Sequence, residues 1–560
     1  MTPWSEKKRL LSTLTTIAIT IVVCSCIVTR LLISKQDTLI VGLQEALLYS
    51  YDCIFFAITN KDFSVLFEAQ KAPLILGLFL MLALIIMSVI VILAAVVSIK
   101  NDAYGDSRFA TSGDLQEMGL LGNLGIILGK KSHRLLNLAV PRHVLVVAPN
   151  RTGKTAGVVI PSIIDFKGST IVTDPKGELY NKLATPLRRR GEKVYCINWA
   201  NPNSPDCWNP ISAKMLPDDP VLLERHAERV AVQFYPKEGG SDSFWQDVSK
   251  KYFASLILYE IFDGKEKNKE PHIGDLYETL VGFQEAEEDE DPFGKHLTAL
   301  AKRAHYMGWS KRITVDLNQW AGTSFKMRST HLDNLTRGIQ IMRSTAVRGS
   351  TRSSSFSFDE LRHQKSTVFI QFPQQDAAYY GQLTALFFES FMAWALDTEM
   401  KQGEKPICII ADEFGSLPQI PLMSDFLSKG AGMGAIIMPI IQDFAQIEKT
   451  YGTYDLQTIR TNCTYTIAFS QNNTNTQKAL TETVGKVTRN KKSLNRKLFA
   501  FVGDASTSIN AEGVDLIRIE EWGSIPFGSH ILIVQGHQTK PVYCKTPLYY
   551  KTPRYRRFLA

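Results

Sequence analysis

Two long apolar runs near the amino terminus are the strongest feature of the hydrophobic pattern. Residues 10–29 read LLSTLTTIAITIVVCSCIVT and residues 73–99 read PLILGLFLMLALIIMSVIVILAAVVSI, and neither run contains a charged side chain. A helix rises about 1.5 Å per residue, so about 20 such residues cross a hydrocarbon layer roughly 30 Å thick. We therefore expect a membrane anchor over 1–100, with spans at 10–29 and 73–99 joined by a short periplasmic loop at 30–72.

The charges beside the first run predict its direction. Lys7, Lys8 and Arg9 precede it directly, and basic residues favour the cytoplasmic side of a membrane. Two crossings then place both termini in the cytoplasm. The alternative is a cleaved signal peptide, but the run is longer than a signal peptide's apolar region of about 7–15 residues, and no A-x-A-like site follows it.

Beyond the anchor, short apolar runs alternate with helical patterns, which is typical of an α/β fold with a largely parallel sheet. The strand-like runs lie at 143–148, 367–372, 406–411, 434–441, 464–469 and 530–534. Between about 212 and 345 the strand-like runs stop, and amphipathic stretches such as VLLERHAERVAVQFY predict helices instead.

The first of these runs leads into a phosphate-binding loop, APNRTGKT, followed by the apolar helical run AGVVIPSII. A strand, a tight loop and a helix are the context that a P-loop requires. Gly153 lets the backbone approach the phosphates, Lys154 reaches the β- and γ-phosphates, and the Thr155 hydroxyl binds Mg²⁺. The sequence thus predicts ATP and Mg²⁺ as ligands of Ala148, Pro149, Asn150, Arg151, Thr152, Gly153, Lys154 and Thr155, although Ala148 stands where the general pattern has glycine.

An acidic pair follows another apolar run, PICIIADEF. We expect Asp412 to hold Mg²⁺ through water and Glu413 to orient or deprotonate the attacking water. The next run ends at Gln442, whose amide is placed to sense the γ-phosphate. The plainer alternatives are a strand that ends in a solvated acidic turn and a surface glutamine.

Net charge and cysteine content add little to the functional interpretation. A net charge of +8 over 560 residues permits contact with DNA or anionic lipid but requires neither. The eight cysteines show no C-x-x-C spacing, which argues against a zinc site or a disulfide framework and fits a reduced cytoplasmic body.

Several further motifs occur in a fixed order along the chain: YGDSRFAT from Tyr104, IVTDPKGELY from Ile171, CWNPIS from Cys207, SFWQDVSKKYFASL from Ser243, and IIQDFAQIEKTYG from Ile440. With the P-loop and the acidic pair, this series resembles the TraG/TraD-type coupling proteins of type IV secretion systems. The resemblance covers roughly residues 1–545.

The resemblance implies a fold and a division into domains. It implies a RecA-like P-loop nucleotide-binding domain, formed by 101–211 and 346–560, with an inserted all-α domain at 212–345 and the two-helix transmembrane anchor. It also implies the bacterial inner membrane as the location and a P-loop ATPase that drives conjugative DNA, or relaxase-linked DNA, into a type IV secretion channel. A receptor for protein effectors and a nucleotide-binding scaffold without motor activity are the alternatives.

The resemblance further implies a hexameric ring with ATP at the subunit interfaces, where a basic residue from the neighbouring subunit completes the site. Lys429 and Arg460 are the two candidates for that residue. The other implied partners are channel components of the inner membrane, the relaxosome or protein effectors, and membrane lipid.

Two smaller features have more than one interpretation. Asp174 and Lys176 either line the nucleotide cleft or pore, or form an Asp-Pro turn that caps a helix. The basic end KTPRYRRF is expected to be a short solvated tail, with DNA, lipid or the anchor as possible contacts.

Overall fold

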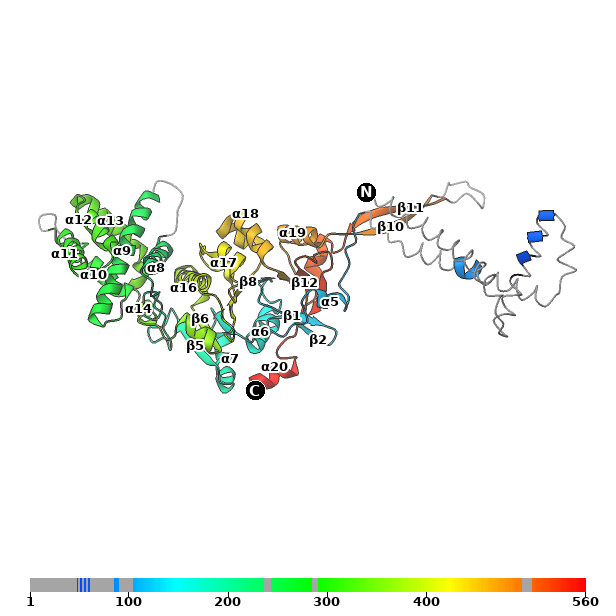
Figure 1. Cartoon of the computed structure of the whole chain (residues 1–560), viewed down its shortest axis with the longest axis horizontal. Helices are drawn as coiled ribbons and strands as arrows, with labels where there is room; N and C mark the ends of the chain where they lie inside the picture. Colours follow the sequence, from blue (N-terminus) through cyan, green and yellow to red (C-terminus); the bar gives the residue numbers. More distant parts are fainter. Residues whose placement is uncertain are drawn as a thin grey trace. The chain divides into compact units, whose positions relative to one another are not determined.

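The computed structural model describes residues 104–235, 243–284, 291–495 and 506–560, together with short helical pieces within 48–60 and at 85–89 (Figure 1). The chain divides into two units, 1–103 with 490–511 and 104–489 with 512–560. Among the described residues no helix is both long and apolar enough to cross a membrane. The expected spans 10–29 and 73–99 lie outside these residues, apart from the piece 85–89.

A sheet of eleven strands, in the order β2-β1-β13-β12-β9-β3-β8-β7-β4-β6-β5, is the frame of the second unit. Seven neighbouring strands, from β9 to β5, run parallel. They are β3 (Val144–Val147), β4 (Ser169–Thr173), β5 (Lys193–Asn198), β6 (Ser366–Gln371), β7 (Ile407–Ala411), β8 (Ala435–Ile441) and β9 (Tyr465–Ala468). β3, β6, β7, β8 and β9 confirm five of the six predicted strands, and β12 below is the sixth. The carboxyl ends of the parallel set meet at one edge, which we call the carboxyl edge; the opposite one is the amino edge.

The sheet as a whole is mixed, because antiparallel strands extend the predicted parallel part on one side. Four strands extend it antiparallel: β12 (Ser529–Val534), β13 (Val542–Lys545), β1 (Ile127–Lys131) and β2 (Arg134–Asn137). Within the pairs β12–β13 and β1–β2 the connections are short, and a short connection permits only an antiparallel return. A separate hairpin consists of β10 (Lys486–Asn495) and β11 (Ser506–Asp515).

Helices cover both faces of the sheet. Alternate residues of β3 point to opposite faces, so Val144 and Val146 belong to one apolar core and Leu145 and Val147 to the other. The first core is completed by α5 (Asp114–Glu117), the π-helix η1 (Thr155–Val159) continued by α6 (Ile160–Asp165), α7 (Glu178–Arg189) and α20 (Pro553–Leu559). The second is completed by α16 (Ala377–Asp397), α17 (Met423–Lys429), α18 (Phe444–Asn462) and α19 (Thr474–Val484).

A helical segment separates β5 from β6. Its described residues contain no strand, and its helices are α8 (Pro220–Phe234), α9 (Ser243–Lys267), α10 (Ile273–Val281), α11 (Pro292–Tyr306), α12 (Lys311–Ala321), α13 (Phe325–Gly338), α14 (Thr345–Ser350) and α15 (Phe358–His363). Aromatic side chains form the contact between this segment and the sheet. Trp208, from the WNP motif, packs edge-on against Trp199 after β5 and against Phe387 of α16, with ring centroids 6.3 and 4.9 Å apart. Trp208 is therefore a packing residue.

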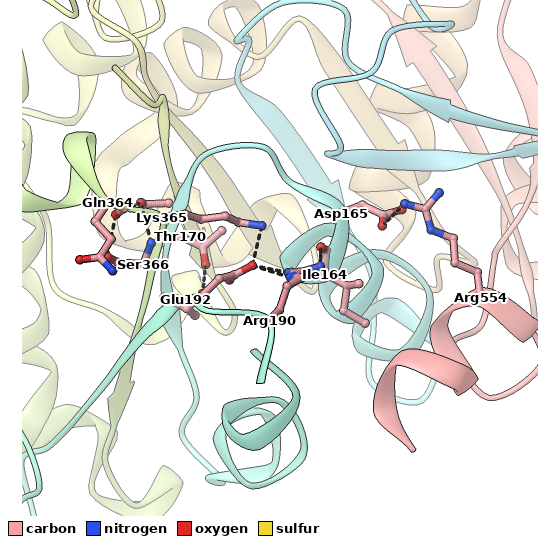
Figure 2. Close-up of polar contacts among 11 residues, drawn as sticks. Ile164, Asp165, Thr170, Arg190, Glu192, Gln364, Lys365, Ser366 and Arg554 are labelled. Carbon is pink, nitrogen blue, oxygen red and sulfur yellow. Dashed lines mark hydrogen bonds and ion pairs between the residues drawn. The ribbon is translucent and has the colours of Figure 1, made fainter. Parts of the chain in front are cut away.

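The carboxyl-terminal residues form a packed helix, α20, so the expectation of a solvated tail is wrong. Tyr555 is 0% exposed and donates a hydrogen bond of 2.8 Å to Asp165 at the end of α6. Arg554 pairs with the same carboxylate at 2.6 Å (Figure 2). The aromatic residue between the arginines was the signal, since burial of one tyrosine side chain favours an ordered helix here.

Candidate nucleotide site

The P-loop lies at the carboxyl edge, between β3 and the helix that starts at Thr155. Arg151 and Gly153 have φ of 64° and 91°, which places both in the left-handed region and folds the chain back on itself. The Thr152 hydroxyl closes the turn by donating to the Pro149 carbonyl at 2.9 Å. The amide groups at the start of the helix are thereby directed at the loop interior, an arrangement that suits an anion.

The acidic pair meets the P-loop lysine. β7 and β3 both pair with β8, one on each side, so Asp412 at the end of β7 comes close to the loop after β3. The Lys154 ammonium lies 2.9 Å from an Asp412 carboxylate oxygen and 3.5 Å from one of Glu413. The Thr155 hydroxyl is 3.5 Å from the other Asp412 oxygen. The predicted lysine, threonine and two carboxylates therefore converge.

The backbone of the acidic pair has two unusual features, a side-chain hydrogen bond to one carbonyl and a left-handed residue. The Thr173 hydroxyl at the end of β4 donates to the Asp412 carbonyl at 2.7 Å. Glu413 has φ of 57° and ψ of 36°, a left-handed conformation that is rare for a side chain other than glycine. Such strain persists only where surrounding contacts require it, and it is frequent at functional sites.

Gln442, at the end of β8, completes the group. Its side-chain amide donates to a Glu413 carboxylate oxygen at 3.3 Å. Its backbone is fixed from two sides: its N–H donates to the Gln446 side-chain oxygen at 3.0 Å, and the Gln471 amide donates to its carbonyl at 3.2 Å. Sequence reasoning missed Gln471, which lies near the end of β9 and is 0% exposed, because no motif surrounds it.

The donor set fits a magnesium nucleotide. The Lys154 ammonium is buried with no hydrogen-bond acceptor other than its ion-pair partners, so a phosphate oxygen would give it a natural partner. The Thr155 hydroxyl and the Asp412 carboxylate are oxygen ligands of the kind that Mg²⁺ prefers.

A second feature that sequence reasoning missed is a strap over the P-loop, formed by residues 546–549 after β13. The Tyr549 N–H donates to the Ala156 carbonyl at 2.9 Å. A Cβ added at Gly157 would lie 1.9 Å from the Thr546 methyl. Gly157 therefore permits the close approach of the strap, which the P-loop motif alone does not indicate.

Asp174 is a helix cap, which decides between its two interpretations. Its carboxylate accepts the N–H groups of Leu179 and Tyr180 at 3.1 and 2.8 Å, and also the Gln371 amide at 3.3 Å. Burial raises the pKa of Asp174 above its usual value, although these hydrogen bonds oppose the shift. Lys176, two residues further along the chain, is exposed.

The two candidate trans-acting residues differ in surroundings. Lys429 ends α17, its side chain is 64% exposed, and its partner is Asp425 on the same helix at 3.6 Å. Arg460 lies in the last turn of α18, beyond the kink at Gly452. Its guanidinium stacks 4.8 Å above the Phe444 ring and donates to the Thr483 hydroxyl at 3.2 Å, while burial lowers its pKa.

The chain was compared with known proteins. Residues 108–559 match the family model described as Type IV secretory system Conjugative DNA transfer. VirD4 of Rhizobium rhizogenes is 25% identical over 551 residues, which cover 94% of this chain and 79% of that protein. The conjugal transfer protein TraG of Escherichia coli is 23% identical over 515 residues, covering 80% and 77%.

Among solved structures, the bacterial conjugative coupling protein TrwB, lacking its first 70 residues, superposes with a TM-score of 0.58 at 14% identity, covering 78% of this chain and 92% of that chain. TrwB in complex with ADP and Mg²⁺ gives a TM-score of 0.57, covering 79% and 94%. These likenesses establish a shared α/β fold. Because the family model spans most of the sequence, the chain belongs to the Type IV secretory system Conjugative DNA transfer family.

Proposed function

We propose that this protein is an ATP-hydrolysing coupling protein that moves conjugative DNA, free or linked to its relaxase, into a type IV secretion channel. The observation that carries the proposal is the convergence of Lys154, Asp412, Glu413 and Gln442 at the carboxyl edge of one sheet. Family membership supports the cargo, and the relative TrwB, solved with ADP and Mg²⁺, supports the ligands.

Each residue has a defined task in hydrolysis. The P-loop amides and Lys154 bind the β- and γ-phosphates, and Thr155 and Asp412 hold Mg²⁺, which neutralises charge on the transferred phosphoryl group. Glu413 orients or deprotonates the attacking water. Gln442, hydrogen-bonded to Glu413, senses whether the γ-phosphate is present and relays this to α18, which begins two residues later.

The domain arrangement and location belong to the same proposal. The anchor at 1–100 holds the protein in the inner membrane with both termini in the cytoplasm, and 101–211 with 346–560 forms the nucleotide-binding domain. The helical segment at 212–345 is an inserted all-α domain. Channel components, the relaxosome and a ring of six copies are the partners.

In the ring, Lys429 of one subunit reaches the ATP of its neighbour. Its exposure supports this role, since its ion-pair partner among the described residues is an exposed carboxylate on the same helix, whereas Arg460 already packs inside its own subunit. Lys429→Ala should therefore lower turnover in the assembled protein more than Arg460→Ala does. Unchanged turnover in both variants would exclude both residues.

The test of the proposal is ATPase activity of the full chain in lipid, with and without single-stranded or duplex DNA, at two salt concentrations. We expect DNA to stimulate the ATPase activity and the stimulation to weaken at higher salt, because protein contacts to DNA phosphates release counterions. ATPase activity indifferent to DNA in the assembled ring would favour protein effectors as cargo. If an assembled ring bound nucleotide but did not hydrolyse it, the result would favour a nucleotide-binding scaffold without motor activity.

A further inference from the structure

A cavity of about 210 Å³ lies on the face of the sheet that α18 and α19 cover. Its walls include the last turn of α18, the helix α19, the strand β9, and β12 with the residues that follow it. Figure 1 shows α18 and α19 on the same side of the sheet, and both contribute to the second apolar core. Within the described chain, no residue of the nucleotide site lines this cavity, so it is a separate feature of the second unit.

Arg460 supplies the charge of this cavity. Among the described residues that line it, Arg460 is the one cation, and there is no aspartate or glutamate. The guanidinium Nη2 donates to the Thr483 hydroxyl at 3.2 Å and to the Ala479 carbonyl at 3.5 Å, and both acceptors are uncharged. No ion pair involves Arg460 in the described part of the chain, and its Nε–H and Nη1–H groups donate to no acceptor there. Burial lowers the pKa of Arg460, although the charge of Glu482 opposes the shift.

Two threonine hydroxyls add further donors to the same cavity. Thr464 and Thr466 lie at the amino edge, where β9 begins, and both line the cavity. Successive side chains of a strand point to opposite faces, so these two share one face, whereas Tyr465 between them belongs to the other apolar core. Neither hydroxyl has a hydrogen-bond partner among the residues that the structure describes. Gln457 and Gln538 contribute side-chain amides to the lining, so a cation and neutral donors meet in one place.

This set of groups fits a small oxyanion. A guanidinium binds carboxylate or phosphate oxygens through paired N–H groups, and such charge-assisted hydrogen bonds are about twice as strong as neutral ones. Hydroxyl and amide side chains donate to the remaining oxygens. At about 210 Å³ the cavity is smaller than the roughly 300–1,000 Å³ of pockets for drug-sized ligands, so its size favours a small ion over a nucleotide.

We propose that this cavity is a binding site for a small oxyanion, phosphate or a short carboxylate, held by Arg460 together with Thr464 and Thr466. Binding requires neither ATP nor DNA. The helix α18 kinks at Gly452, and Arg460 stacks across the kink on the ring of Phe444. An anion that joins Arg460 to β9 therefore ties the last turn of α18 to the sheet and slows local opening there.

The experiment follows amide hydrogen exchange of the full chain in phosphatidylcholine nanodiscs, with sodium chloride, phosphate or acetate added at equal ionic strength. We expect phosphate, acetate or both to slow exchange in 457–466 and 478–484 relative to chloride. The effect should saturate, and exchange should slow by about tenfold when the anion is present at ten times its Kd. An effect of phosphate alone identifies a tetrahedral ligand, and an effect of acetate alone identifies a carboxylate.

Two variants remove the proposed ligand contacts. Arg460→Gln should abolish the slowing of exchange. Thr466→Val keeps a β-branched side chain but lacks the hydroxyl, and it should raise the anion concentration for half-maximal slowing by about tenfold. The matched control is Arg337→Gln, which removes the same charge from an exposed arginine in the last turn of α13 and should keep the effect.

Three results would overturn the proposal. The first is exchange in 457–466 and 478–484 that is equal in all three salts. The second is slowing confined to the P-loop segment 148–158, which would place the anion in the nucleotide site instead. The third is slowing that persists unchanged in both Arg460→Gln and Thr466→Val.

Discussion

Glu389 provides a quantitative test of the packing between α16 and α17. Its side chain, on α16, is 4% exposed and accepts the Leu422 N–H at 3.1 Å. Burial raises its pKa from 4.5 to about 7, although the Leu422 N–H and the charge of Arg229 oppose the shift. In the unfolded chain this carboxyl ionises near its ordinary value, so between these two pH values the folded protein binds a proton that the unfolded chain has lost.

The free energy of unfolding must therefore fall as the pH rises through this window. A shift from 4.5 to about 7 corresponds to about 3 kcal/mol at most. Glu389→Gln stays neutral and keeps an oxygen for Leu422. We expect the variant to match the wild type near pH 4.5 and to exceed it by about 2–3 kcal/mol at pH 8.

The assay is chemical or thermal unfolding of the full chain in lipid discs at several pH values. Glu266→Gln is the matched control, because Glu266 is an exposed glutamate on α9 and its replacement should leave the pH dependence unchanged. A stability difference between Glu389→Gln and the wild type that stays constant from pH 4.5 to 8 would refute the reasoning.

Three further variants test individual contacts. Thr173→Val removes the hydrogen bond to the Asp412 carbonyl. It should slow ATP turnover several-fold, which is an increase of about 1 kcal/mol in the activation free energy, and leave nucleotide affinity nearly unchanged. Turnover equal to that of the wild type would show that this bond does not position the acidic pair. Gly157→Ala places a methyl against Thr546 and should destabilise the protein by about 1–3 kcal/mol, and adding Thr546→Ser should restore part of that loss in thermal unfolding; no rescue would contradict the strap contact. Tyr555→Phe removes the hydrogen bond to Asp165. It should lower the free energy of unfolding by about 1–2 kcal/mol and speed amide hydrogen exchange in α20. Unchanged exchange would mean that packing alone holds the helix.

The sequence predicted five of the seven parallel strands and the convergence at the nucleotide site for a simple reason. Each predicted strand is a continuous apolar run, and parallel strands bring the residues after them to one edge. Lys154, Asp412, Glu413 and Gln442 follow three such runs, so their meeting was inferable without coordinates. Their roles in hydrolysis remain predictions.

What the sequence could not predict depends on contacts between distant segments. β1, β2 and β13 are short and lack a long apolar run, so the hydrophobic pattern did not predict them as strands. The strap at 546–549 and Gln471 act on the site across long sequence separations. The membrane spans stay a prediction from hydropathy alone.

The central claim, that hydrolysis drives transfer, is tested most directly by Glu413→Gln in cells that rely on this chain for conjugation. Nucleotide binding and DNA transfer are measured in the same variant, with Glu266→Gln, a change at an exposed acid on α9, as control. We predict that Glu413→Gln retains ATP binding and loses transfer by at least about a hundredfold, as expected when the residue that activates water is removed. Transfer at the wild-type frequency by a Glu413→Gln protein that no longer hydrolyses ATP would contradict the account.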